Sequence, residues 1–173
     1  MTFYSGFSLK NESYLFKNYI DSSQYCVCGF SYGAIKAYEH VNQHVKNGKR
    51  VDTLQLFSPA FFQTKPTKFK RVQTLSYKKN KDAYLREFIS SCFSPHEKKI
   101  IENVETNSQE LEELLNYVWD IEALKELQKN GVKIEVYIGA KDEIIDAESA
   151  KDFFLHVATL TYIKDANHFL QIK

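Results

Sequence analysis

The residues with the clearest chemical potential in this chain form the motif Gly29-Phe30-Ser31-Tyr32-Gly33. A serine hydroxyl is a weak nucleophile, so it has to be exposed where a neighbouring base can take its proton. The spacing Gly-x-Ser-x-Gly is typical of a nucleophile elbow, in which the serine lies on a sharp turn between a strand and a helix. Glycine is expected on both sides because a side chain there would crowd the adjoining strand or helix. The motif therefore predicts Ser31 as a nucleophile.

The segments around the motif fit such a turn. Tyr25 to Cys28 is a short apolar run that indicates a buried strand, and the pattern from Tyr32 to Val45 predicts a helix. The N–H groups that a helix start leaves free would face negative charge developing on a substrate. Thr2 to Tyr4 is another predicted strand, and it leads into a small-residue turn from Ser5 to Leu9. That turn either supplies the second part of an oxyanion hole or simply ends the strand.

Two further polar residues follow predicted strands near the end of the chain. Asp142 comes after the strand Val132 to Ile138, and His168 comes after the strand Leu160 to Lys164. In a parallel sheet the active-site groups lie at the carboxyl ends of the strands, where Ser31 is also expected. The chain order Ser, Asp, His is one of the known orders of a catalytic triad. We therefore expect His168 to be the general base and Asp142 to orient its imidazole.

Other acidic residues compete with Asp142 for the position beside His168. The rivals are Glu143, Asp146 and Asp165. Asp146 is expected to cap the helix that follows it. Asp165 is too close to His168 in sequence to face its ring comfortably. Asp142 is the acid that the spacing favours.

Histidine and cysteine usage gives no indication of a metal site. His40 and His44 lie one helical turn apart, but no third ligand is evident and the glutamate of a zinc-protease helix is absent, which favours surface histidines. Cys26 and Cys28 are expected to point to opposite faces of a strand, which would exclude a disulfide between them. Three reduced, mostly buried cysteines fit a cytoplasmic protein.

Composition places the chain among ordinary globular proteins. It has 173 residues, 43% of them apolar and 26% charged, which suits a single domain, residues 1–173, with a sizeable core. The formal net charge of +1 gives no indication of nucleic-acid binding. No apolar run approaches the roughly 20 residues of a membrane span. The first residues lack the basic and apolar regions of a secretory signal, so a cytoplasmic location is expected.

Alternating strands and helices predict an α/β fold with a parallel sheet and helices on both faces. A strand is expected from Val51 to Phe57, and residues 60–129 form a helical insertion before the strand that starts at Val132. The remaining predicted helices are Asn11 to Ile20, Lys81 to Cys92, His96 to Val104, Gln109 to Lys129 with a break near Trp119, and Asp146 to His156.

Charge is segregated within the insertion. Its first part is basic, and its second part carries mainly glutamate and aspartate from Glu102 to Glu126. One interpretation is two solvated helix faces that differ in sign. The other is a cap over the active site whose basic part docks an acidic partner. The basic residues are Lys65, Lys68, Lys70, Arg71, Lys78, Lys79, Lys81 and Arg86.

The serine motif, the Gly-x-x-Asp loop and the terminal Asn-His resemble an α/β-hydrolase. In detail the chain is similar, over nearly its whole length, to the short BioV-type pimeloyl-[acyl-carrier-protein] methyl ester esterases of biotin synthesis. The resemblance is carried by Phe3-Tyr4-Ser5-Gly6-Phe7, Asn11-Glu12-Ser13, Gly29-Phe30-Ser31, Gly33-Ala34-Ile35-Lys36-Ala37, Leu56-Phe57-Ser58-Pro59, Phe69-Lys70-Arg71, Gly131-Val132-Lys133-Ile134-Glu135-Val136 and Asn167-His168.

The resemblance implies a serine esterase that needs no cofactor and converts pimeloyl-[acyl-carrier protein] methyl ester to pimeloyl-[acyl-carrier protein] and methanol. It implies backbone N–H donors at Phe7 and Tyr32, although Ser5 stands where the wider family has histidine. Under the cap the acyl chain is expected to pass Phe7, Phe61, Phe62 and Trp119. Docking of the acidic carrier protein is expected from Lys68, Lys70, Arg71, Lys78 and Lys79.

The chain departs from the family in length. Only about twenty residues separate Gly6 from Gly29, which leaves room for one helix where the full fold has a helix, a strand and another helix. The resemblance then implies a minimal α/β-hydrolase of about five adjacent parallel strands, with the first strand at an edge that needs cover. A general short-chain esterase or thioesterase, and a non-catalytic carrier-protein binder, remain as alternative functions.

Overall fold

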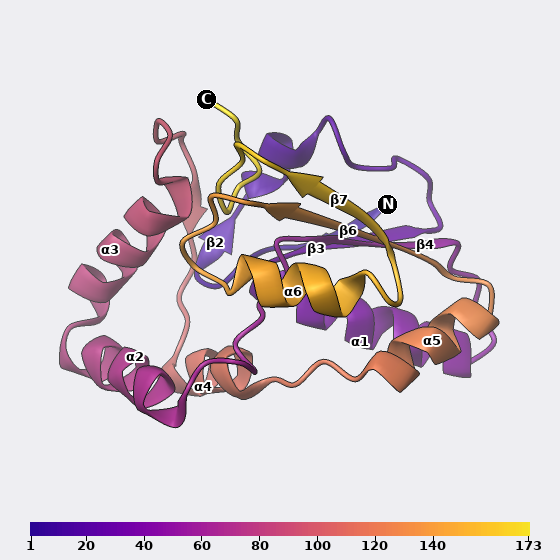
Figure 1. Cartoon of the computed structure of the whole chain (residues 1–173), viewed down its shortest axis with the longest axis horizontal. Helices are drawn as coiled ribbons and strands as arrows, with labels where there is room; N and C mark the ends of the chain where they lie inside the picture. The colour runs from indigo at the N-terminus through magenta and orange to yellow at the C-terminus, as the bar shows by residue number, and fades with distance from the viewer.

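A five-stranded parallel sheet forms the centre of the molecule (Figure 1). The computed structural model covers residues 1–173. The strand order is β1-β3-β4-β6-β7, and each neighbouring pair is parallel. The predicted fold class, a minimal α/β-hydrolase with about five parallel strands, is confirmed. The strands are β1 (Thr2–Tyr4), β3 (Cys26–Phe30), β4 (Thr53–Phe57), β6 (Lys133–Gly139) and β7 (Thr159–Ile163).

The central strands are buried on both sides because both faces of the sheet are covered. Every residue of β3 and β4 is buried, as expected for the interior of a parallel sheet. Helices α1 (Tyr32–Lys46), α5 (Ile121–Lys129) and α6 (Ala147–Phe154) lie together on one face (Figure 1). They present apolar stripes such as Ala34, Ala37 and Val41 to the larger of two core clusters.

The opposite face is covered mainly by loops and one short helix. A 3₁₀ helix, η1 (Glu12–Phe16), stands where a longer helix from Asn11 to Ile20 was predicted. Its Phe16 enters the second core cluster with Phe30, Phe57 and Phe169. The prediction was wrong in length, because the helix ends at Phe16 and residues 17–19 form a turn.

Three helices lie beyond the carboxyl ends of the strands, and we refer to them as the cap helices (Figure 1). They are α2 (Thr67–Lys79), α3 (Lys81–Phe93) and α4 (Ser108–Asn116). Of these, α3 matches a predicted helix, whereas α2 had no counterpart among the predicted ranges. The expected break near Trp119 is confirmed, because α4 ends at Asn116 and α5 begins at Ile121. Although α5 falls within the predicted insertion, it packs beside β6.

The segment after α3 is extended rather than helical, so the helix predicted from His96 to Val104 is wrong. Within it β5 (Glu102–Asn103) pairs antiparallel with β2 (Leu9–Lys10), which follows β1 in the chain. The backbone N–H of Val104 also donates to the carbonyl of Ser8 at 3.1 Å. The segment between the cap helices α3 and α4 is thereby attached to the loop between β1 and β2.

Cys26 and Cys28 lie on the same face of β3, and the expectation of opposite faces was wrong. Residues two apart in a strand share a face, and the two sulfur atoms are 3.6 Å apart. Both thiols also face the side-chain oxygen of Gln55, with Cys28 Sγ at 3.3 Å. All three cysteines of the chain are free and buried.

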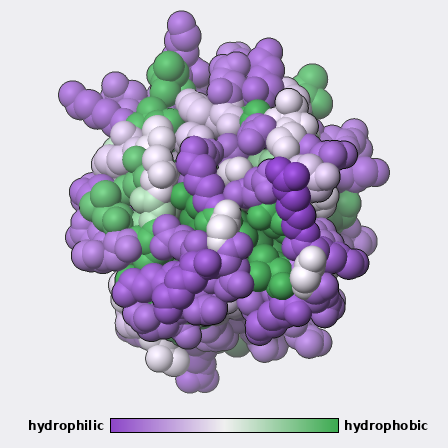
Figure 2. All heavy atoms as spheres, turned by 90° about the vertical axis from the view of Figure 1, so that its right-hand side faces the viewer, coloured by the Kyte–Doolittle hydropathy of each residue, from purple (hydrophilic) through white to green (hydrophobic).

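The surface at the α5 end of the molecule is mainly hydrophilic (Figure 2). Figure 2 shows the side of the molecule on which α5 lies, where hydrophilic side chains surround a smaller hydrophobic area. None of the helices combines the length and the apolar composition that a membrane-spanning segment requires.

Candidate active site

The predicted elbow is a sharp turn between β3 and α1. Ser31 has φ of 53° and ψ of −115°, an unfavourable conformation for a residue with a side chain. The surrounding packing holds it there. A Cβ atom on Gly29 would lie 2.2 Å from the carbonyl oxygen of Gly33, and one on Gly33 would lie 2.1 Å from that of Tyr4. Glycine is therefore required at both positions, as the motif predicted, and the turn places Ser31 at the carboxyl end of β3.

Three residues far apart in the sequence form a chain of hydrogen bonds, which we call the Ser–His–Asp chain. Ser31 Oγ lies 3.0 Å from His168 Nε2, and His168 Nδ1 lies 2.6 Å from Asp142 Oδ2. The exposed fractions are 4% for Ser31, 9% for Asp142 and 0% for His168. In this geometry the imidazole can take the proton of the hydroxyl while the carboxylate orients the ring.

The loop after β6 orients the carboxylate of Asp142. Its Oδ1 accepts from the backbone N–H groups of Ile144 at 2.8 Å and Ile145 at 3.2 Å. The other oxygen, Oδ2, is left for His168. The start of this loop lies against the loop that carries His168, because a Cβ atom on Gly139 would be 2.3 Å from the carbonyl oxygen of Ala166.

The side chain of Asn167 holds the loop that presents His168. Its Nδ2 donates to the carbonyl of Phe93 at 2.7 Å, and its Oδ1 accepts from the N–H groups of Phe169 and Gln171, both at 3.0 Å. The ring of Phe30 packs 4.9 Å from the imidazole, between ring centres. This positioning role of Asn167 was not predicted, since its partner Phe93 lies far away in the sequence.

The rival acids occupy other positions. Asp146 caps α6, accepting from the N–H of Ser149 at 3.2 Å, as predicted. Asp165 forms an ion pair with Lys141 at 3.2 Å. Glu143 is exposed. Of the four acids considered, Asp142 is the one that contacts His168.

The loop between β1 and β2 lies directly against the elbow. The ideal Cβ position on Gly33 is only 2.5 Å from the carbonyl oxygen of Ser5, and the ring of Phe7 is 6.3 Å from that of Tyr32. The backbone N–H of Phe7 makes no hydrogen bond within the protein. Tyr32 is the first residue of α1, so its N–H has no partner within the helix. Both expected donors are thus available beside Ser31.

Comparison with solved structures gives consistent matches. A carboxylesterase of the thaumarchaeon Nitrososphaera gargenis matches with a TM-score of 0.54 and 14% identity, over 83% of this chain and 57% of that chain. A hydrolase from Oleispira antarctica gives 0.60 and 14%, over 85% and 59%. E-2-(acetamidomethylene)succinate hydrolase gives 0.58 and 11%, over 97% and 84%. The chain thus spans less than two thirds of the first two proteins.

The chain has the α/β-hydrolase fold. No protein-family model matches the sequence, and no curated protein matches it. At these identities the likeness defines the architecture, while the Ser–His–Asp chain defines the chemistry that the protein can perform.

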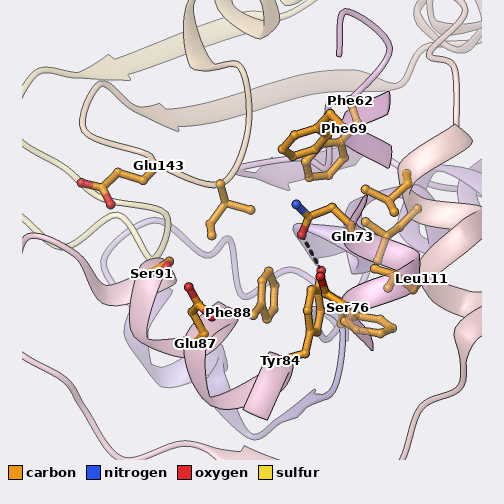
Figure 3. Close-up of a pocket in the computed structure, with 14 residues that line it drawn as sticks. Phe62, Phe69, Gln73, Ser76, Tyr84, Glu87, Phe88, Ser91, Leu111 and Glu143 are labelled. Carbon is orange, nitrogen blue, oxygen red and sulfur yellow. Dashed lines mark hydrogen bonds between the residues drawn. The ribbon is translucent and has the colours of Figure 1, made fainter. Parts of the chain in front are cut away.

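A cavity of about 310 Å³ lies between the cap helices and the Asp142 loop (Figure 3). The cavity wall reaches the Ser–His–Asp chain at two residues. The ring of Phe7 contacts that of Tyr32, and the N–H of Ile144 donates to Asp142. Burial raises the pKa of Tyr84 to about 12, and its neutral hydroxyl donates to Gln73 at 3.0 Å. The lining residues are Phe7, Phe62, Phe69, Gln73, Ser76, Tyr84, Glu87, Phe88, Ser91, Leu111, Leu114, Leu115, Glu143 and Ile144.

Two of the four expected acyl-chain contacts, Phe7 and Phe62, line this cavity. Phe62 stacks on Phe69 at its wall. Phe61 packs instead on α6, with its ring 5.6 Å from that of Phe153. Trp119 is buried beside α1 and α6, and its Nε1 donates to the carbonyl of Ala60 at 2.8 Å. Aromatic type alone could not separate core residues from cavity residues.

The five expected docking residues all lie on α2, where they do not share one face. Lys68, Arg71, Lys78 and Lys79 are exposed, whereas Lys70 is half-buried. Lys78 forms an ion pair with Glu112 of α4 at 3.0 Å. Helical spacing places Lys68, Arg71 and Lys79 on the outer face.

His40 and His44 stack on one another, with ring centres 3.9 Å apart, and Tyr4 Oη lies 2.6 Å from His40 Nδ1. Both rings are half-buried. The structure brings no three metal-ligating side chains together, here or elsewhere.

Proposed function

We propose that this α/β-hydrolase is a serine carboxylesterase that hydrolyses the methyl ester of pimeloyl-[acyl-carrier protein] in biotin synthesis. The observation that carries the proposal is the contact of 3.0 Å between Ser31 Oγ and His168 Nε2, with Asp142 on the other ring nitrogen. The carboxylesterase and hydrolase structures that share the fold support ester hydrolysis. The sequence resemblance described above supports the specific substrate.

The first half of the reaction transfers the acyl group to the enzyme. Ser31 Oγ attacks the ester carbonyl carbon, and its proton moves to His168 Nε2. The carbonyl oxygen becomes negatively charged and accepts hydrogen bonds from the N–H groups of Phe7 and Tyr32. Each such donor contributes roughly 3 kcal/mol to the transition state in other hydrolases. The C–O bond to the methoxy group then breaks, and His168 returns the proton so that methanol leaves.

The second half releases the acid. His168 takes a proton from water, whose oxygen attacks the acyl-enzyme carbonyl. The bond to Ser31 Oγ breaks, and the proton on His168 restores the serine hydroxyl. Glu143 lies at the wall of the cavity that takes the acyl chain. Like charges disfavour retention of the product carboxylate there, which assists release.

The cavity suits an uncharged linear acyl chain. Nine of its fourteen lining residues are hydrophobic, and each methylene buried there contributes about 0.8 kcal/mol. Its only ionisable carboxylates, Glu87 and Glu143, are both exposed, and no cationic side chain lines it. A methyl ester fits this lining better than a free carboxylate does.

The outer face of α2 supports an acidic carrier protein as the partner. Lys68, Arg71 and Lys79 flank two exposed apolar side chains, Val72 and Leu75, on the same face. No acidic residue occurs in α2. Positive charge around a small apolar centre matches a partner with the opposite charge and an apolar contact of its own.

Mass spectrometry of carrier-linked pimeloyl methyl ester tests this function. Wild type is expected to remove the methyl group, and Ser31→Ala is expected to leave the ester intact. A fluorophosphonate should label wild type but not Ser31→Ala. Labelling without turnover of the carrier-linked ester would refute the proposed substrate, and absence of labelling would refute serine catalysis.

A general short-chain esterase or thioesterase is the second candidate, favoured by the carboxylesterases among the structural matches. Turnover of free dimethyl pimelate is compared with that of the carrier-linked ester. A preference of kcat/KM for the carrier-linked ester supports the specific function, whereas equal values identify a general esterase.

A further inference from the structure

A fully buried carboxyl group lies behind the loop between β1 and β2 and takes no part in the mechanism above. Glu12, the first residue of η1, has an exposed fraction of 0%. Its Oε1 accepts from the backbone N–H of Gly6 at 2.8 Å, and its Oε2 has no hydrogen-bond partner. Burying a carboxyl group with so few partners is costly, so its position calls for a reason.

The hydrogen bond to Glu12 acts on the residue that precedes an expected oxyanion donor. The carbonyl of Gly6 accepts from the N–H of Leu9 at 3.1 Å. Because the peptide bond is planar and trans, the N–H of Phe7 must point in the opposite direction from that carbonyl. Gly6 is therefore held through both its N–H and its carbonyl, and these two bonds set the direction of the Phe7 N–H.

Glu12 is the acceptor of the Gly6 N–H in the structure. Gly6 is buried, and the atoms nearest to its ideal Cβ position belong to the side chains of Phe30 and Leu9, at 2.8 and 3.1 Å. Without the carboxyl oxygen the Gly6 N–H would lose this acceptor. The peptide between Ser5 and Gly6 would then turn toward another acceptor. The backbone of Gly6 would shift with it, and so would the Phe7 N–H.

We propose that Glu12 is a positioning residue that aims the backbone N–H of Phe7 at the oxyanion of the reaction. The proposal rests on the serine hydrolase function proposed above, but not on the identity of its substrate. Glu12 itself touches no reacting atom. Its hydrogen bond is made to the peptide between Ser5 and Gly6, whose carbonyl oxygen lies against the elbow at Gly33. It acts on the Phe7 N–H through the backbone of Gly6.

The electrostatics of the site are compatible with this role. Burial raises the pKa of Glu12 above its usual value, although the N–H of Gly6 and the hydroxyl of Ser5 act in the opposite direction. A raised pKa reduces the negative charge that Glu12 carries near a developing oxyanion. An amide oxygen could accept the same hydrogen bond, so glutamine is the conservative replacement.

The test compares an ester with its thiono analogue, in which sulfur replaces the carbonyl oxygen. Sulfur is a weak hydrogen-bond acceptor, so the ratio of the two kcat values reports on the oxyanion donors. The substrates are 4-nitrophenyl acetate and 4-nitrophenyl thionoacetate. The variant is Glu12→Met, because methionine keeps the length and fills an apolar site.

We expect Glu12→Met to lower kcat for the ester about 10- to 100-fold, somewhat less than deletion of a donor does in other hydrolases. KM and the thionoester rate should change less than threefold, so the ratio falls. Glu12→Gln should restore most of the ratio. Glu12→Asp, which withdraws the carboxyl group by one methylene, should lower the ratio and serves if the methionine variant does not fold.

Glu135→Ala is the matched control, since this partly buried carboxyl group lies on β6 with Gln55 and Tyr137, away from the elbow. It should lower the melting temperature without changing the ratio. The proposal is overturned if ester and thionoester rates fall together, or if the ester rate of Glu12→Met stays within twofold of wild type. If wild type reacts with neither ester nor thionoester and is not labelled by a fluorophosphonate, both serine catalysis and the proposal for Glu12 are overturned. If wild type is inactive toward the carrier-linked ester alone, only the proposed substrate is overturned.

Discussion

The two carboxylate oxygens of Asp142 perform different tasks. Oδ1 accepts from Ile144 and Ile145 and so shapes the loop, while Oδ2 binds His168 Nδ1 at 2.6 Å. A substitution that keeps the contacts to the loop and changes the contact to His168 would separate the structural role of Asp142 from its catalytic role. Asparagine is such a residue, because its amide oxygen can still accept from the loop.

Asp142→Asn is expected to lower kcat by roughly 10³- to 10⁴-fold, since its amide N–H₂ facing Nδ1 favours the wrong tautomer of His168. Fluorophosphonate labelling should slow in parallel, and the melting temperature should change little. A kcat within tenfold of wild type would show that another group orients His168.

Glu12 gives a pH-dependent contribution to stability. Because the folded state raises its pKa, the folded state binds a proton more tightly than the unfolded chain, whose carboxyl pKa is about 4.3. The contribution is fully present below that value and is lost as pH rises through the folded pKa.

The free energy of unfolding of wild type relative to Glu12→Gln should therefore fall between about pH 4 and the folded pKa and then level off. Urea titrations of both proteins at a series of pH values measure this difference. A difference that stays constant with pH, or one that rises, would contradict the raised pKa.

At the scale of elements, local patterns were sufficient where a segment's own residues decide its structure. The apolar runs of β3, β4 and β6, and the glycines of the elbow, could be recognised in sequence. Ser31, Asp142 and His168 could be placed together because each follows a strand of one parallel sheet.

Segments that depend on distant partners could not be predicted in this way. The local sequence of residues 96–104 was compatible with a helix. Their conformation is instead set by the pairing of β5 with β2, which lies about ninety positions earlier. Glu12 and Asn167 gave no local signal either, because their partners Gly6 and Phe93 are known only from the fold. The same holds for Trp119, whose burial beside α1 decides against a cavity role.

The junction of β6 with the Asp142 loop should be sensitive to a single methyl group. In Gly139→Ala the new Cβ atom would meet the backbone oxygens of Ala166 and Asn167 at 2.3 and 2.4 Å. The loop that carries His168 must shift, so we expect kcat to fall at least 100-fold by analogy with misplacement of other catalytic groups.

Gly48→Ala is the control for this substitution. Gly48 follows α1 with φ of 68° and open space around it, so alanine there costs roughly 1–2 kcal/mol of stability through strain alone. Its kcat should equal that of wild type. If both variants lose activity in proportion to stability, the close contact at Gly139 is not what positions His168.

At the scale of the whole molecule, the basic helix α2 is far from α5, whose two glutamates balance its two lysines. The basic outer face of α2 lies on the cap, while α5 lies at the far end of the sheet (Figure 1). Exposed charges act on a partner mainly through association and are screened by salt. Their contribution is therefore testable by charge reversal at either end.

Lys68→Glu with Lys79→Glu should raise KM for the carrier-linked ester several-fold, leave KM for dimethyl pimelate unchanged, and weaken the salt dependence of the former. Lys129→Glu on α5, where the lysine side chain is 72% exposed, is the control. An equal rise in KM for both variants would point to net charge rather than to docking on α2.

The short pairing of β2 with β5 attaches the segment between the cap helices α3 and α4 to the stretch that carries Phe7. The contact of Ser8 Oγ with Thr106 Oγ1 and the bond from Val104 to Ser8 strengthen the same attachment. Thr106→Val should thus accelerate amide exchange at Val104 and slow turnover at the same time. The cap helices and the expected oxyanion donor at Phe7 would then move together. A displacement of the cap would therefore also slow the reaction at Ser31.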